Sequence, residues 1–87
     1  MIDAKEVLQK VVECEIDQPL QVYNVEYESD LKGYFGFGDW WELNGTPKSN
    51  TWYLLAWSLD KEEPFSSNYD MVATAKDGAK CYIYELQ

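Results

Sequence analysis

The sequence predicts an α+β domain in which one N-terminal helix packs on an antiparallel sheet of about five strands. Three observations support this. Apolar residues recur at helical spacing only near the N-terminus, segments rich in Val, Ile and aromatic residues follow, and turn signals separate those segments. A chain of 87 residues allows one compact domain, residues 1–87. Because 46% of its residues are apolar and 16% are aromatic, we expect a packed core rather than a disordered chain.

The predicted helix has a clear start. Asp3 takes the capping position with Glu6 three residues later, and Ile2 and Val7 occupy the two positions of a hydrophobic staple. The helix should end near Glu15, because Pro19 follows and β-type residues take over. Its apolar face comprises Val7, Leu8, Val11, Val12 and Cys14.

Two strands are expected in the next segment. Residues 21–28 alternate, which places Tyr23, Val25 and Tyr27 on one face, and residues 29–33 read as a turn. The following stretch, GYFGFGDWWEL (33–43), reads as a second strand that is unusually rich in glycine and rings. Asn44-Gly45 ends it as a turn signal.

The remaining strands are predicted from one long apolar run and one hairpin signal. TWYLLAWSL (51–59) is the most continuously apolar segment, so we expect a central strand covered on both faces. Residues 60–70 should form a polar loop, with Phe65 exposed or tucked back. MVATA and AKCYIYEL flank the turn signal at residues 76–78 and predict a final hairpin.

Charge is the strongest global signal. Sixteen acids against seven lysines, with no arginine or histidine, give a net charge of −9. Such a chain repels nucleic-acid backbones and anionic membranes, so we expect neither as a partner and expect a basic protein surface instead. The alternative is that the acidity only keeps a small domain soluble.

The residue types for common catalytic and metal chemistry are missing. Without histidine there is no Ser-His or Cys-His pair and no zinc pattern, so we predict neither enzyme activity nor a cofactor. Cys14 and Cys81 are expected to be buried free thiols in the cytoplasm, with a bridge between them as the alternative. No secretory signal or membrane span is recognisable, which also favours the cytoplasm. The alternating acids Glu26, Glu28 and Asp30 indicate a solvated strand face, or a site for a hard cation.

The two adjacent tryptophans favour a binding surface. Neighbouring residues on a strand point to opposite faces, so one of Trp40 and Trp41 should be at least partly exposed. An exposed tryptophan beside an acid such as Asp39 is typical of an interface anchor.

The sequence therefore predicts a small acidic inhibitor or immunity-type protein, of phage or other mobile-element origin. It would occlude a basic, nucleic-acid-handling surface of a partner enzyme, either as a nucleic-acid mimic whose acids stand in for phosphates or through ordinary charge complementarity. The expected partner-binding residues are Glu26, Glu28, Asp30, Tyr34, Asp39, Trp40, Trp41, Asp60, Glu62 and Glu63. One alternative is a small-molecule binding domain with an aromatic pocket. Another is a subunit that binds its own copies, so both a monomer and a small homo-oligomer remain open.

Overall fold

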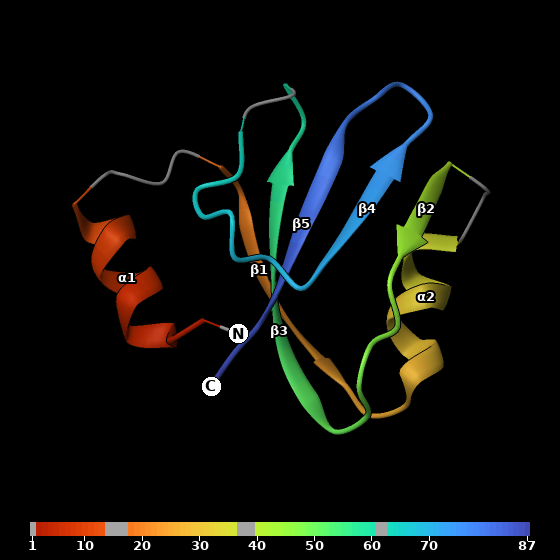
Figure 1. Cartoon of the computed structure of the whole chain (residues 1–87), viewed down its shortest axis with the longest axis horizontal. Helices are drawn as coiled ribbons and strands as arrows, with labels where there is room; N and C mark the ends of the chain where they lie inside the picture. The colour runs from red at the N-terminus through yellow and green to blue at the C-terminus, as the bar shows by residue number, and fades with distance from the viewer. Residues whose placement is uncertain (1, 14–17, 37–39, 61–62) are drawn as a thin grey trace.

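The structure, a computed structural model, describes residues 2–13, 18–36, 40–60 and 63–87 (Figure 1). Two helices and five strands follow one another along the chain. Their bounds are α1 Ala4–Val12, β1 Leu20–Val25, α2 Glu28–Gly36, β2 Trp41–Asn44, β3 Thr51–Ser58, β4 Met71–Ala75 and β5 Lys80–Glu85. The predicted α+β class is confirmed.

The five strands form one antiparallel sheet in the order β1-β3-β5-β4-β2. Strands β3, β5 and β4 therefore lie inside the sheet, and β1 and β2 form its edges. This agrees with the prediction of a central strand at 51–59. Ile2 also pairs with Leu86 in a parallel bridge, which brings the two ends of the chain together (Figure 1).

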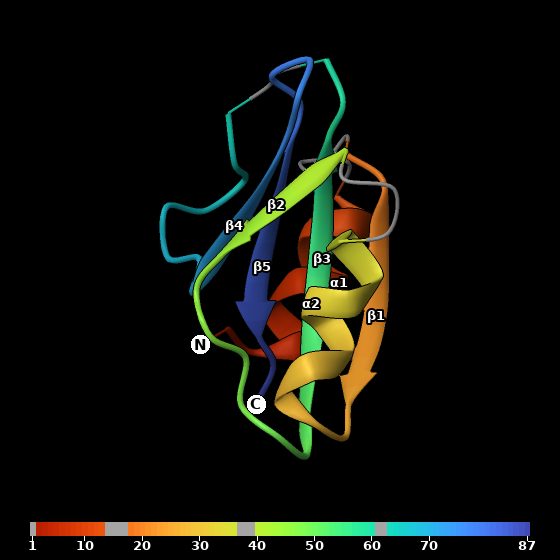
Figure 2. The ribbon, with the colours of Figure 1, turned by 90° about the vertical axis from the view of Figure 1, so that its right-hand side faces the viewer.

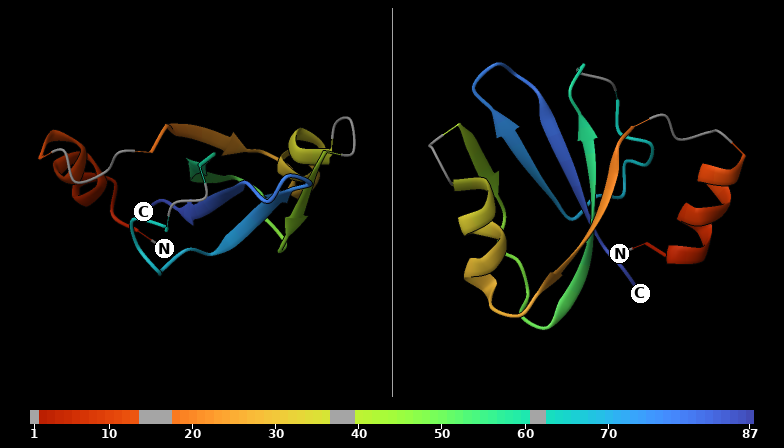
Figure 3. Two further views of the ribbon diagram at one scale, coloured as in Figure 1. Left: turned by 90° about the horizontal axis from the view of Figure 1, so that it is seen from above. Right: turned by 180° about the vertical axis from the view of Figure 1, so that it is seen from behind.

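The sheet has a separate apolar core on each face, with one helix on either side (Figures 2 and 3). The α2 face carries the larger core, where Leu31 and Phe35 of α2 pack on strand residues that include Val25, Leu55 and Ile83. The α1 face carries Ile2 and Val7 packed with Leu54, Ala56, Tyr82 and Tyr84. Because successive side chains of β3 alternate between the two cores, residues 53–56 and Ser58 are buried.

Helix α1 begins as the sequence predicts, but little of its apolar face is covered. The Lys5 backbone N–H donates to Oδ1 of Asp3 at 2.9 Å, which makes Asp3 the cap. Val7 is the buried residue of the helix, whereas Leu8, Val11 and Val12 are exposed. The predicted apolar face therefore exists, and the described part of the sheet covers only one side of it.

The predicted strand over residues 33–43 is wrong in its first half. Residues 28–36, including the whole of the expected turn at 29–33, form α2, and only Trp41–Asn44 is a strand. Leu31 and Phe35 are one helical turn apart and both are buried, and their burial outweighs the low helix propensity of Gly33 and Gly36. Phe37, Gly38 and Asp39 lie outside the described residues.

The final hairpin and the loop before it follow the prediction. The Ala79 backbone N–H donates to Oδ1 of Asp77, and Gly78 adopts a positive φ of 92° in the turn. Phe65 is tucked back, with its ring 4.7 Å from that of Tyr84. The Tyr84 hydroxyl donates to the Ser66 carbonyl at 2.6 Å, which fixes the loop on the α1 face.

Candidate partner-binding surface

The described residues that we predicted for partner binding do not lie on one surface. Glu26, Glu28 and Asp30 lie where β1 passes into α2, next to the start of β3. Asp60 and Glu63 follow the end of β3, at the opposite end of the sheet. An eight-residue strand separates the two groups by roughly 26 Å, at about 3.3 Å per residue. Asp39 and Glu62 lie outside the described residues.

The predicted row of acids on a strand is also corrected. Strand β1 ends at Val25, so Glu26 lies in a bend and Glu28 and Asp30 belong to the first turn of α2. Oδ2 of Asp30 accepts hydrogen bonds from the backbone N–H groups of Tyr27, at 2.9 Å, and Glu26, at 3.1 Å. Asp30 thus caps the helix in the manner of a capping box, while Glu26 and Glu28 remain exposed.

This bend presents Tyr27 to solvent between two carboxylates. Sequence alternation placed Tyr27 on the face of Tyr23 and Val25, yet its side chain is 67% exposed because the strand ends two residues earlier. The Asp30 N–H donates to the Tyr27 carbonyl at 2.9 Å, and the Asn50 N–H donates to the Glu26 carbonyl at 3.3 Å. Backbone hydrogen bonds on both sides therefore hold the backbone that carries the exposed ring. We call Glu26, Tyr27 and Glu28 the acidic turn.

A hollow of about 270 Å³ adjoins the acidic turn. Its walls come from the first half of α2 and from the segment after β2. The lining residues are Glu28, Ser29, Lys32, Gly45, Thr46 and Pro47. A side chain from a partner would fit beside the Glu28 carboxylate here.

The two tryptophans have different environments, as adjacent residues must. Trp40 is 50% exposed, and its carbonyl accepts a hydrogen bond from the Lys76 N–H at 3.0 Å. The Trp41 ring packs on Trp57 edge to face, with 5.4 Å between ring centroids, and on Phe35 at 5.7 Å. Trp40 is therefore the exposed tryptophan of the pair, and it lies at the end of the sheet away from the acidic turn.

The aromatic cluster expected as an alternative ligand pocket packs largely against itself. Tyr34 of α2 lies 5.2 Å from Tyr23 and 5.3 Å from Phe35 between ring centroids. Phe35, Trp41 and Trp57 continue the cluster at 5.4 to 5.7 Å. These ring contacts make the cluster part of the core on the α2 face, with Tyr34 at its partly exposed rim.

Reactive groups lie away from these surfaces. Cys81 is a fully buried free thiol, and burial raises its pKa to about 12, which disfavours the thiolate. Cys14 lies outside the described residues. Within the described ranges, no three Cys, Asp or Glu side chains are grouped closely enough to hold a metal ion. Neither α1 nor α2, the two described helices, is long enough to cross a membrane.

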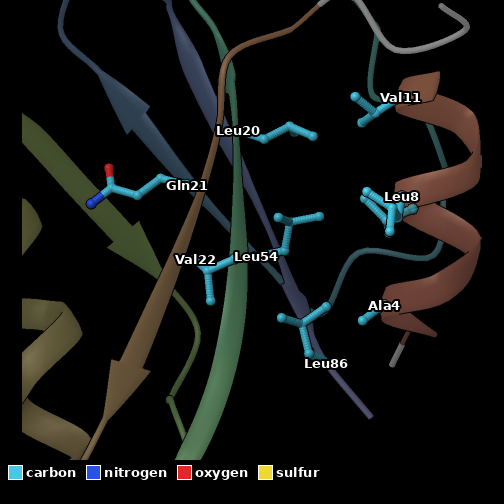
Figure 4. A pocket seen from close by; sticks show the side chains of 9 residues that line it. Ala4, Leu8, Val11, Leu20, Gln21, Val22, Leu54 and Leu86 are labelled. Atoms are coloured by element: carbon cyan, nitrogen blue, oxygen red, sulfur yellow. The ribbon is translucent and has the colours of Figure 1, made fainter.

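One further surface was missed by sequence reasoning. A groove of about 230 Å³ separates α1 from β1 and β3, and its lining is aliphatic apart from Gln21 (Figure 4). Figure 4 shows Leu8 and Val11 pointing from α1 toward Leu20, Leu54 and Leu86. We call this the α1 groove. The apolar spacing of α1 was visible in the sequence, but nothing there showed that part of it stays uncovered.

Comparisons with family models, curated proteins and solved structures find no match. The function must therefore be argued from the surfaces themselves.

Proposed function

We propose that this chain is a small acidic, protein-binding inhibitor of immunity type, which occludes a basic, nucleic-acid-handling surface of a partner enzyme. The observation that supports this best is the acidic turn, where an exposed tyrosine stands between two exposed carboxylates on a hydrogen-bonded backbone. Tyrosine is among the residues that most often dominate binding energy, since it adds a large contact area and loses little conformational freedom.

Charge favours a basic partner. The two carboxylates of the acidic turn provide acceptors for lysine and arginine side chains, which otherwise bind phosphates. The net charge of −9 would attract such a partner over a longer range and speed the encounter. Both effects weaken with added salt, because charges further apart than about 10 Å are screened at 0.1 M ionic strength.

The hollow beside Glu28 adds a place for one partner side chain. A partner side chain would contact Pro47 and Thr46 there, and because Glu28 and Lys32 both line the hollow, a neutral side chain fits it better than a charged one. Trp40 offers a second contact only to a partner wide enough to span the sheet, because it lies at the other end.

A capture experiment with matched charge variants tests the proposal. The bait is the whole chain, incubated with cell lysate, and captured proteins are eluted either with salt or with a duplex DNA competitor. We compare Glu26→Gln/Glu28→Gln with Glu6→Gln/Glu42→Gln, which removes the same charge at exposed positions elsewhere. A basic, DNA-binding protein should be retained by the control variant, lost by the acidic-turn variant and displaced by DNA.

The captured protein is then purified, and its binding to DNA is measured with and without the chain. The proposal predicts that the chain blocks DNA binding, and that Tyr27→Ala weakens the complex about 10- to 30-fold, or roughly 1.4–2 kcal/mol. If the captured proteins are acidic or neutral and resist high salt, or if both double variants lose them equally, the proposal is wrong.

A further inference from the structure

The free edge of β1 and the α1 groove involve the same residues. Strand β1 is first in the sheet, and within the described chain it pairs only with β3. The Trp57 N–H donates to the Pro19 carbonyl at 2.9 Å, which sets the alternation of the antiparallel ladder. Backbone hydrogen bonds to β3 therefore come from Gln21, Tyr23 and Val25. The intervening residues point their N–H and C=O groups away from β3; they are Leu20, Val22 and Asn24.

The side chains of those outward-bonding residues lie on the α1 face. Leu20 and Val22 line the α1 groove opposite Leu8 and Val11, and Val22 is 55% exposed. A strand added to β1 would place the side chains opposite Leu20, Val22 and Asn24 on this same face. The main-chain groups and the groove are thus available to one and the same incoming strand.

The other edge of the sheet is protected, and β1 is not. Strand β2 has only four residues and includes the exposed Glu42. Strand β1 has six residues, LQVYNV, without a charge, a proline or a glycine. Charged residues and short length are the usual means by which proteins keep an edge strand unpaired, so their absence favours pairing at β1.

Charge bears on which molecule supplies the strand that pairs with β1. The nine residues that line the α1 groove carry no formal charge, in a chain whose net charge is −9. A basic partner forms no direct ion pair at such a surface, and two acidic copies meet there without opposing carboxylates directly. The net charge of −9 on each copy still repels the other, so self-association should strengthen with added salt. The exposed apolar side chains that line the groove, namely Leu8, Val11 and Val22, would be covered by the same contact.

We propose that two copies of this chain associate through their β1 strands, paired antiparallel about a two-fold axis at Val22. Val22 then faces Val22 of the second copy, and Leu20 faces Asn24 of the second copy on either side. The two strands thus form three residue pairs, each joined by two backbone hydrogen bonds. All the N–H and C=O groups in these bonds belong to Leu20, Val22 and Asn24, whose backbone groups do not bond to β3. The two five-stranded sheets become continuous, and each α1 groove is covered from the side of the new strand.

Sedimentation with two matched variants tests the role of the groove. The wild-type chain should approach twice its 10.2 kDa mass at high concentration and dissociate on dilution, with a dissociation constant of roughly micromolar order for a small interface. Leu8→Glu, at a site 65% exposed on α1, should stay monomeric. Leu59→Glu makes the same change at a site 56% exposed outside the groove, and it should dimerise like the wild type. Circular dichroism and thermal melts confirm that both variants are folded.

Cysteine cross-linking tests the register. In a Cys14→Ser background, Val22→Cys places two thiols opposite each other, with Cα atoms about 5.5 Å apart, within the range that a disulfide spans. Asn24→Cys is the matched control, because its counterpart in the second copy is Leu20. Mild oxidation should convert Val22→Cys to a covalent dimer at least ten times faster than Asn24→Cys.

Two results would overturn the proposal. One is a mass of 10.2 kDa at every concentration up to roughly 1 mM. The other is equal cross-linking of the two cysteine variants. In the first case, binding of an apolar dye to the groove, lost in Leu8→Glu, would assign the groove to a different occupant.

Discussion

Gly33 lies in the middle of α2 and offers a direct test of that helix. A Cβ atom built on Gly33 meets nothing within 4 Å, and its φ is not in the positive range that favours glycine. Gly33→Ala therefore adds no clash and removes only the extra freedom that glycine gives the unfolded chain. We expect it to raise the free energy of unfolding by about 0.5–1 kcal/mol.

The gain is measurable in a domain of this size. For 60–100 residues, 1 kcal/mol shifts Tm by roughly 4–8 °C, so Gly33→Ala should melt about 2–8 °C higher. Urea unfolding followed by tryptophan fluorescence gives the free energy directly, and the slope of free energy against urea should not change.

Gly45→Ala is the matched control. Gly45 has a φ of 133°, and a Cβ there would collide with the Met71 side chain, so this substitution should destabilise the domain. If Gly33→Ala is as harmful as Gly45→Ala, residue 33 does not have helical geometry, and the α2 assignment is refuted.

Two further predictions concern the helix cap and the buried ionisable groups. Asp30→Ala removes the acceptor for two backbone N–H groups and should lower the free energy of unfolding in urea by about 1–2 kcal/mol. Asp30→Asn keeps one acceptor oxygen and should lower it by less. Equal losses in the two variants would show that these hydrogen bonds contribute nothing to stability. Burial raises the pKa of Cys81 from 9.0 to about 12 and that of Tyr84 from 10.0 to about 12. Because ionisation favours the unfolded chain, the stability that these two groups contribute should be complete below pH 9 and fall as pH rises toward 12. Urea midpoints at several pH values measure this, and a Tyr84→Phe/Cys81→Ala variant that shows the same alkaline loss would contradict it.

The elements with strong local signals were predictable from sequence. The Asp3 cap, the alternating start of β1, the apolar run of β3 and the turn at Gly78 each form as expected. Helix α2 was not predictable in the same way, because Gly33 and Gly36 disfavour a helix and Tyr34 and Phe35 favour a strand locally. The signal for a helix was the spacing of Leu31 and Phe35, which becomes decisive only when the sheet buries both.

The same error explains what was missed at the candidate surface. Placing the strand through residue 28 put Tyr27 on the core side and lined up three acids on one face. Once β1 ends at Val25, Tyr27 becomes exposed and Asp30 becomes a cap. The partial exposure of one of the adjacent tryptophans was predictable, because it depends only on the opposite directions of neighbouring side chains at the start of β2 and not on where β1 ends.

The unequal covering of the two sheet faces has a consequence for local unfolding. Helix α1 buries only Val7 of its nine residues, whereas α2 inserts both Leu31 and Phe35 into the larger core. The helix can therefore detach without exposing much of the sheet, so its amide protons should exchange with solvent well before those of β3 and β5. The rate of amide exchange in α1 therefore reports on any molecule that covers the α1 groove. Contact at the groove would add buried surface to α1, so the helix would open less often and its amide protons would exchange more slowly.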